Sequence, residues 1–495
     1  MLSKISLLTL LFLTFLFSVD LFAQKTKKKT TKSKPKAQQV FTVSVAPDRI
    51  STSSSQIDES IPANSTPLQK RRYETFDKVW NTINKYYFDP TFGGLNWKAV
   101  HAEFRPKIKS IKTDYDLHLM LQEMINRFNR SHLFMVLPEA FEEVEQAKAE
   151  SKRKEAEREK ETEKSKTDIE KTNEGEKPDD PDEEIFYEYG LPINVRILDS
   201  QVVVTEVKTG SNAEKSGLKT GYILDKINGV SLKTLIARVE NYNAFGKVIK
   251  DQMPQIILSF LNGEEDSEVE ITYIDELNLA HSKYIKREGL AGDLVSILKN
   301  LPEQRVTFDS KIINEKTGYI RFNFFAFPIL TKFCTAMTEF KNKEAIIIDL
   351  RGNMGGAISV LWGLTGLLNN KTIKLGTEVT RAGKSPQMIS SMPNNYKGKI
   401  VILIDGQSVS AAEILASGLQ ENGRAILVGE KTAGQALPSV TVSLPTGGAF
   451  IYPYASFESP KGKFLEGSGV EPDIKVSLER KTLLEGKDNQ LERAL

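Results

Sequence analysis

Hydrophobic residues near the start of the chain recur at helical spacing. Over 68–87 the apolar side chains, among them Phe76 and Trp80, follow one another at three- and four-residue steps, which indicates an amphipathic helix. A second helix is predicted over 114–128, and an extended run from Leu133 to Leu137 follows it. These patterns predict a small N-terminal helical domain at 67–140.

From 186 onward the pattern changes to short runs typical of strands. Gln201 to Val207 and Ile223 to Ile227 are rich in branched apolar residues, and Asn228-Gly229 forms a tight-turn signal between strands. We therefore predict a β-rich domain at 183–278.

The second half of the chain alternates continuous apolar runs with helical patterns. Strands are expected at 345–350, 399–404 and 425–428, and helices at 329–341 and 410–421. Continuous apolar strands that alternate with helices indicate a largely parallel sheet that is buried on both faces. The fold class is therefore α/β and multidomain, with a core at 279–480 and a C-terminal tail at 481–495.

Three other segments carry no core pattern. Lys4, an apolar run from Leu7 to Phe17 and the small residue Ala23 have the layout of a cleavable signal peptide at 1–23. The run is shorter than the roughly 20 residues that a spanning helix needs, so the expectation is an exported protein with no integral membrane segment after cleavage; the alternative is an uncleaved anchor. The polar segment 24–66 is expected to be a disordered tether, and 141–182, almost entirely charged, a disordered insert.

Composition narrows the classes of function. The chain has 67 basic and 65 acidic residues and a net charge of +2, which argues against nucleic acid as a partner. Its single cysteine, Cys334, excludes an intrachain disulfide and a zinc site of cysteine type. We expect this residue to be a buried small hydrophobe, and no metal or cofactor is predicted.

In a largely parallel sheet, chemistry is expected where strands end and helices begin. Ser408 and Ser410 lie at one such junction, where the free amides of a helix N-terminus favour developing negative charge. The alternative is that one of them is only an N-cap. Another junction, Asp349 to Gly356, ends in two glycines, which permit the close backbone approach that an oxyanion-binding loop requires.

At these junctions the chain resembles the C-terminal processing peptidases, also called tail-specific proteases. The matching strings are Asp349 to Gly356, Ser408 to Glu413, Gly429 to Gly434 and Glu466 to Asp473. The resemblance implies a crotonase/ClpP-like spiral core in which Ser410 is the nucleophile. It also implies an oxyanion hole made by Gly356 with the amide of Ser410 itself or of Ala411.

One residue departs from the family pattern. Many members use a Ser-Lys dyad, but Gln435 stands at the lysine position, and an amide cannot act as a general base near neutral pH. The sequence also resembles the tricorn-like branch of the family, which has a Ser-His-Glu arrangement. This resemblance implies His132 as the base and Glu466 as the acid that orients it. The alternative base is Lys431, four residues before the family position.

The remaining histidines are given no catalytic role. His101 and His118 fall within helical patterns and are expected to be structural, and His281 lies in a polar stretch and is expected to be solvated. His132 and Glu466 have structural alternatives too, as a helix-end residue and as a surface ion-pair partner.

The β-rich region resembles a PDZ domain of the bacterial protease type, through Tyr189 to Pro192, Gly217-Leu218 and Ile227 to Gly229. Such a module binds an extended peptide as an added strand, which implies peptide binding at Gly190, Leu191 and Ile193. Because proline has no amide proton, Pro192 is expected to weaken capture of a terminal carboxylate.

The expected protein is an exported, secreted or periplasmic, serine endopeptidase that acts on protein or peptide substrates. The alternative is an inactive family member that binds peptides as a scaffold. The sequence leaves the oligomeric state and the cleavage preference open.

Overall fold

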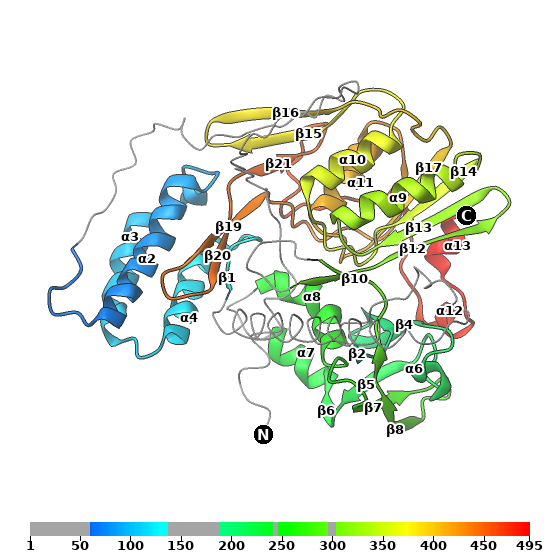
Figure 1. Ribbon diagram of the computed structural model, residues 1–495, viewed down its shortest axis with the longest axis horizontal. Coiled ribbons are helices and arrows are strands. Elements are labelled where there is room, and N and C mark those ends of the chain that lie inside the picture. Colours follow the sequence, from blue (N-terminus) through cyan, green and yellow to red (C-terminus); the bar gives the residue numbers. More distant parts are fainter. Residues whose placement is uncertain (1–59, 137–188, 241–245, 296–302) are drawn as a thin grey trace, which may run out of the picture.

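The computed structural model describes residues 60–136, 189–240, 246–295 and 303–495. The predicted signal peptide and almost all of the predicted tether and charged insert lie outside these ranges. Figure 1 shows three bodies: helices from the N-terminal part, a β-rich domain, and an α/β core that also carries the end of the chain. Within the described ranges, no helix has the length and apolar character needed to cross a membrane.

The N-terminal helical domain contains the two predicted helices. Its helices are α2 (Pro67–Tyr86), α3 (Trp97–Phe104) and α4 (Asp114–Ile125), with the 3₁₀ turns η1 (Phe92–Gly94), η2 (Arg105–Ser110) and η3 (Asn126–Phe128). Thr66 and Thr113 begin α2 and α4 with capping boxes. Trp80 of α2 and Trp97 of α3 stack in the hydrophobic core of this domain, with ring centroids 6.1 Å apart.

The helical domain joins the rest of the protein through a shared sheet. Its last strand, β1 (Phe134–Val136), pairs antiparallel with β20 (Ala449–Pro453), which pairs with β19 (Ser439–Ser443). This pairing brings the cyan and orange parts of the chain together in Figure 1. The residues just before β1 are therefore held against the core.

The β-rich domain is larger than the sequence pattern indicated. It comprises β2 (Tyr189–Gly190), β3 (Ile193–Leu198), β4 (Gln201–Val207), α6 (Asn212–Lys215), β5 (Ile223–Ile227), β6 (Val230–Ser231), α7 (Leu232–Glu240), α8 (Gly246–Ser259), β7 (Glu268–Ile274), β8 (Ala280–Lys286) and β9 (Glu288–Gly289). Its main sheet has the order β3-β4-β5-β7-β8. The hairpin of β7 and β8 extends past the predicted boundary at 278, to Lys286. His281 lies in β8, where its Nε2 is 2.7 Å from Asp275 Oδ2, so it is not merely solvated.

The core is built on a six-stranded sheet of order β12-β13-β14-β17-β18-β22, parallel from β13 onward. Its elements are β10 (Asp293–Val295), β11 (Gln304–Val306), β12 (Phe308–Asn314), β13 (Thr317–Phe322), α9 (Phe327–Glu339), β14 (Ala345–Asp349), α10 (Ile358–Leu368), β15 (Ile373–Thr380), β16 (Gly383–Ile389), β17 (Lys399–Ile404), α11 (Ala411–Glu421), β18 (Ile426–Gly429), β21 (Ser456–Glu458), β22 (Ile474–Lys475), α12 (Arg480–Leu484) and α13 (Asn489–Ala494). The predicted parallel α/β core is confirmed.

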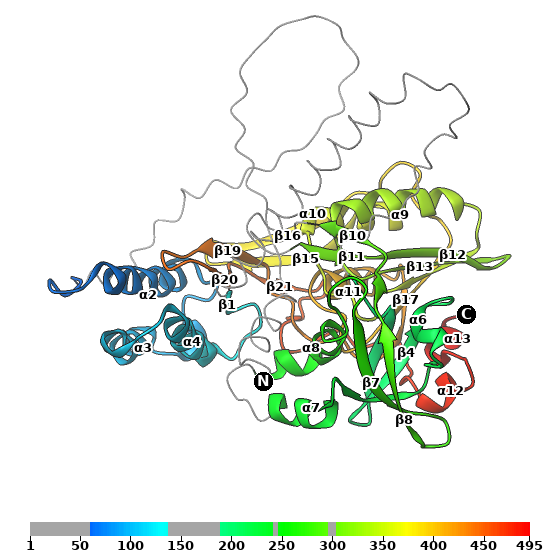
Figure 2. The same ribbon diagram turned by 60° about the horizontal axis from the view of Figure 1, so that its bottom comes forward.

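Both faces of this sheet are buried, as its continuous apolar strands predict. Ile346 and Ile348 point to the side covered by α9, α10 and α11, and Figure 2 shows α9 and α10 above the sheet. Ile347, between them on β14, points to the other side and belongs to a cluster with Leu491 and Ala494 of α13. The segment 481–495, predicted only as a tail, therefore forms two helices and covers part of the core.

The expectation for Cys334 is wrong. The residue lies on α9 but is exposed. Its neighbour Phe333 is fully buried, and one step along a helix turns the next side chain by roughly 100°, away from the sheet.

A buried polar contact fixes the helical domain to the core. Thr446, in the turn between β19 and β20, lies 3.1 Å from Thr75 Oγ1 and 3.1 Å from His118 Nε2. The Thr446→Val substitution should lower the free energy of unfolding by roughly 1–3 kcal/mol, because it removes a partner from two buried polar groups. Denaturant unfolding followed by tryptophan fluorescence measures this loss. Thr446→Ser should retain most of the stability, and Thr338→Val on the exposed face of α9 is the control; equal stability of all three variants would contradict the role of this contact.

Candidate active site

The two junctions singled out from the sequence lie side by side. β14 and β17 are parallel neighbours, with Asp349 opposite Leu403, so the loops that follow them leave the same edge of the sheet. Three hydrogen bonds join these loops: Val409 N to Asn353 O at 2.9 Å, Ser408 Oγ to Leu350 O at 2.8 Å, and Gly352 N to Asp405 Oδ1 at 3.0 Å. The glycine loop and the serine loop therefore form one rigid unit.

Ser410 stands at the start of α11 with a strained backbone. Its φ is 57° and its ψ is −111°, a region that costs a non-glycine residue about 1–3 kcal/mol. An N-cap residue normally has an extended backbone, so capping alone does not account for this conformation. Ser408 is structural instead, because its buried hydroxyl accepts from Asp405 N at 3.0 Å and donates to Leu350 O.

Glu413 holds the backbone of Ser410 in place. The side chain is fully buried, and its carboxylate accepts four hydrogen bonds: from Ser410 N at 3.0 Å, Thr432 Oγ1 at 2.6 Å, Gly434 N at 2.7 Å and Gln435 N at 2.8 Å. Burial raises the pKa of Glu413 to about 7, against the opposing effect of these donors. The carboxylate joins the start of α11 to the loop after β18.

His132 and Glu466 are connected through a residue that the sequence analysis gave no role. Ser131 Oγ lies 2.6 Å from His132 Nδ1 and 2.8 Å from Glu466 Oε2, and Ser131 N donates to Glu466 Oε1 at 3.0 Å. The expected pairing of Glu466 with the imidazole is thus relayed by the hydroxyl of Ser131. The serine directly before His132 in the Ser-His string was the available signal for it.

This relay determines which ring nitrogen of His132 carries the proton. An ionised carboxylate only accepts, so the single hydroxyl proton of Ser131 goes to Glu466, and the hydroxyl oxygen accepts from Nδ1–H. Nε2 then keeps its lone pair, as a general base requires. Burial lowers the pKa of His132 to about 3 and raises that of Glu466, so the ring is neutral over the ordinary pH range.

The His132 turn lies against the serine loop. Phe134 packs on Val409 and Ala433, two residues from His132 on one side and one residue from Ser410 on the other. The amides of two successive residues complete the connection, because Gln435 N donates to Glu413 and Ala436 N donates to Glu466 at 3.1 Å. The folded chain thus places the turn that carries His132, 278 residues before Ser410 in the sequence, against the loops connected to Ser410 and Glu466.

The two alternatives for the base occupy different environments. Gln435 is buried in this same loop. Lys431 is half-exposed, and its Nζ forms an ion pair with Glu471 at 2.8 Å. The lysine closest to the family position is therefore engaged at the surface.

Gly356 lies where only glycine fits. Its φ is 135°, and an added Cβ would come within 2.4 Å of Phe325 O. Of the two amides proposed to act with it, Ser410 N is already bonded to Glu413. This leaves the amide of Ala411 as the candidate partner of Gly356.

In the β-rich domain, the loop predicted to bind peptide has some of its backbone groups engaged in other contacts. Gly190 pairs with Glu288 through β2 and β9, and Leu191 is buried. Ile193 N donates to Leu191 O at 2.8 Å, so this amide is engaged within the loop itself, and Pro192 has none. In the described part of the chain, β3 is an edge strand of the main sheet.

Two stretches of the chain match models of known protein families. Residues 316–476 match the model of peptidase family S41, and residues 68–126 match the tricorn protease C1 domain. The fold and the matched domains define a serine-type peptidase. Residues 316–476 thus carry an S41 peptidase domain, and the curated relatives that match this chain are carboxyl-terminal-processing proteases.

Curated relatives match at low identity. A carboxyl-terminal-processing peptidase 3 of Arabidopsis thaliana is 28% identical over 293 residues, 58% of this chain, and the match spans only 53% of that relative. Carboxyl-terminal-processing proteases of Picosynechococcus and Synechocystis are 24% and 23% identical over 81% and 80% of this chain, and 82% and 78% of their own lengths.

Solved structures share the fold. The photosystem II D1 C-terminal processing protease superimposes with a TM-score of 0.50 at 18% identity, over 85% of this chain and 98% of that one. Mature CPAF complexed with lactacystin gives 0.53 at 14% identity, over 85% and 96%.

The two buried histidines make stability depend on pH. Burial lowers the pKa of His118 to about 4 and that of His132 to about 3 from 6.5, so below pH 6.5 the unfolded chain binds more protons than the folded chain. Their contribution is complete above pH 6.5 and is lost as the pH falls toward 3–4, by roughly 2 kcal/mol each at pH 5. Glu413, whose pKa is raised to about 7, contributes with the opposite sign in this window, so urea unfolding at pH 7.5 and pH 5 is compared between wild type and His118→Gln. His118→Gln should show a smaller difference; an unchanged difference would contradict the assignment.

Proposed function

We propose that the protein is an exported serine endopeptidase in which Ser410 is the nucleophile and His132 the general base. The observation that carries the proposal is the Glu466–Ser131–His132 chain of hydrogen bonds, packed against the loop that bears Ser410. The strained backbone of Ser410 supports it, because strain of this kind persists where the surrounding structure enforces a functional conformation.

The proposed reaction is acyl transfer. Ser410 Oγ attacks the carbonyl carbon of the scissile peptide while His132 Nε2 takes the hydroxyl proton. The amides of Gly356 and Ala411 donate to the oxyanion of the tetrahedral intermediate. The imidazolium then gives its proton to the leaving amine, the C–N bond breaks, and a water molecule hydrolyses the acyl-enzyme by the same steps.

The electrostatics of the site suit this cycle. A buried histidine with a low pKa is neutral and ready to accept a proton, but its charged form is costly. That cost is reduced at the moment of transfer, because Glu466 stabilises the imidazolium through Ser131 and the oxyanion forms nearby. Ser131 therefore acts as a positioning residue in this proposal.

The β-rich domain is proposed to bind substrate polypeptide as a PDZ-like module. The edge of β3 offers main-chain groups to an added strand. Pro192 and the engaged amide of Ile193 reduce the donors available to a terminal carboxylate, so recognition should depend on the strand more than on the chain end. Export of the protein rests on the sequence of residues 1–23 alone.

A fluorophosphonate probe tests the nucleophile. Wild type should be labelled, Ser410→Ala should lose all labelling, and Ser417→Ala, further along α11, is the matched control. Absence of labelling in the wild-type protein would favour the alternative, a catalytically inactive peptide-binding scaffold.

The relay is tested by Ser131→Ala. Without the hydroxyl, the tautomer and orientation of His132 are no longer held, and kcat should fall by about 10²–10⁴-fold. KM should change little, because Ser131 is not proposed to contact substrate. A steady-state assay at pH 7.5 measures both constants, and activity near that of wild type would refute the relay.

Peptide binding is tested with two fluorescent decapeptides that differ only in a free or amidated C-terminus. Because few amides face the carboxylate, their dissociation constants should agree within about threefold. Fluorescence anisotropy with the Ser410→Ala protein measures them. Tight binding of the free acid alone would show ordinary carboxylate capture.

A further inference from the structure

The segment 477–494, here called the strap, contacts two bodies of the protein. On the β-rich domain, Arg480 donates to Gly221 O at 2.9 Å and to Asp275 O at 3.0 Å. Leu483 is buried in a cluster with Val203 and Ile223. These contacts hold the first half of the strap against the sheet of that domain.

The backbone of Gly221 lies close to the side chain of Leu484 in the strap. A Cβ added to Gly221 would lie 2.7 Å from Leu484 Cγ, and Leu484 packs against the core of the β-rich domain. In Figure 1 the strap helices α12 and α13 run in red beside this domain and up to the core.

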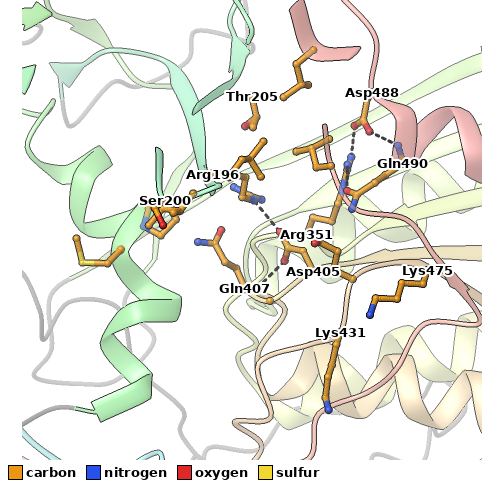
Figure 3. Close-up of a pocket in the computed structure, with 18 of the residues that line it drawn as sticks. Arg196, Ser200, Thr205, Arg351, Asp405, Gln407, Lys431, Lys475, Asp488 and Gln490 are labelled. Atoms are coloured by element: carbon orange, nitrogen blue, oxygen red, sulfur yellow. Dashed lines mark hydrogen bonds and ion pairs between the residues drawn. The ribbon is translucent and has the colours of Figure 1, made fainter. Parts of the chain in front are cut away.

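The second half of the strap packs on the peptidase core. Leu491 and Ala494 join the cluster under β14 and β17, and Gln490 Nε2 donates to Val476 O at 2.7 Å. Asp488 Oδ2 lies 2.7 Å from Arg351 Nη2, and Arg351 Nη1 donates to Gln490 Oε1 at 2.9 Å. Figure 3 shows Asp488 and Gln490 pointing toward Arg351 from the strap.

Arg351 belongs to the glycine loop. Its guanidinium is bidentate on Asp349, with Nε 2.9 Å from Oδ1 and Nη2 2.7 Å from Oδ2. This pairing holds the pKa of the fully buried Asp349 well below its ordinary value. Gly352, the next residue, donates to Asp405 of the serine loop. A change at Arg351 therefore acts on the backbone that leads to Gly356.

The direct contacts between the β-rich domain and the core are ionic. Arg196 on β3 pairs with Asp405 at 2.8 Å, and Glu206 on β4 pairs with Arg321 at 2.7 Å. Arg196, Asp405 and Arg321 line a cavity of about 560 Å³ that also has the strap as a wall, through Leu483 and Asp488. The Arg321–Glu206 pair is partly exposed, and such pairs contribute little to docking, so the apolar strap contacts are an additional connection between the β-rich domain and the core.

We propose that the strap is a positioning element of the peptidase, with Arg351 and Asp488 as positioning residues for the glycine loop. This inference rests on the proposed function and extends it to substrate recognition. Ile197 and Leu198, at the end of β3, also line the cavity, so a polypeptide paired with β3 continues into it. The strap sets the width of this cavity and holds the loop that receives the oxyanion.

The core half of the strap is tested by Asp488→Asn. Arg351 keeps Asp349 in this variant, so the protein should fold. On an amidated peptide too short to reach β3, kcat should fall about tenfold with KM unchanged, and the amides of 352–356 should exchange hydrogen faster. Asp488→Glu should recover part of the rate. The matched control is Glu485→Gln in the same segment. Among the ion pairs of the described residues, Glu485 pairs only with the exposed Lys487.

The domain half is tested by Leu483→Asp, which places a charge in the apolar contact. KM for a long polypeptide substrate should rise at least tenfold, while kcat/KM for the short peptide stays within about twofold. Small-angle scattering should show an expanded particle, because the β-rich domain is released.

Three results would overturn the inference. The first is Asp488→Asn matching Glu485→Gln in rate and in hydrogen exchange. The second is a fractional loss of kcat/KM that is the same for the short and the long substrate in both Asp488→Asn and Leu483→Asp. Such a loss indicates a structural role only. The third is an unexpanded Leu483→Asp protein. If wild type neither cleaves peptides nor reacts with a fluorophosphonate, the proposed function fails, and exchange and scattering still decide the role of the strap.

Discussion

The candidate site depends on two carboxylates held by successive amides of one loop. Gln435 N donates to Glu413 and Ala436 N donates to Glu466. Glu413 fixes the backbone of Ser410, and Glu466 fixes Ser131 beside His132. Because a peptide unit is planar and short, these two hydrogen bonds hold the carboxylates near each other, together with the serine and histidine loops that they contact.

Each buried carboxylate is unfavourable by itself and is stable only together with its hydrogen-bond donors. Transfer of a carboxylate from water is unfavourable unless hydrogen bonds compensate for it. Glu413 has four donors and Glu466 three. The same low-polarity surroundings lower the pKa of His132 and strengthen every remaining interaction in the site. The strain at Ser410 is likewise offset by these donors, which links the folding of the core to the geometry of the site.

The two faces of the central sheet are covered by different elements. Helices α9, α10 and α11 cover one face and supply the bulk of the core. The other face is partly covered by α13, whose segment continues to the β-rich domain. The same strap thus contacts both the sheet and the β-rich domain, and the Arg351–Asp488 ion pair connects it to the glycine loop.

The sequence by itself determined the local elements and the identities of the chemical groups. The strands 345–349 and 399–404, the helix after Ser410 and the glycine loop follow from apolar runs, turn residues and short motifs that act over a few neighbouring positions. Gln435 excludes a lysine base at the family position for the same local reason, since an amide is not a base, and the resemblance to the tricorn-like branch then implies His132.

Only the tertiary structure decided the relay through Ser131, the engagement of the amides of Ser410 and Ile193, the exposure of Cys334, and the role of the strap. Each depends on the pairing of groups far apart in the chain, such as β1 with β20, Ser131 with Glu466, or Leu483 with Val203. A one-dimensional pattern records which faces are apolar. It does not record which other surface will cover them, because that choice is made by packing the complete chain.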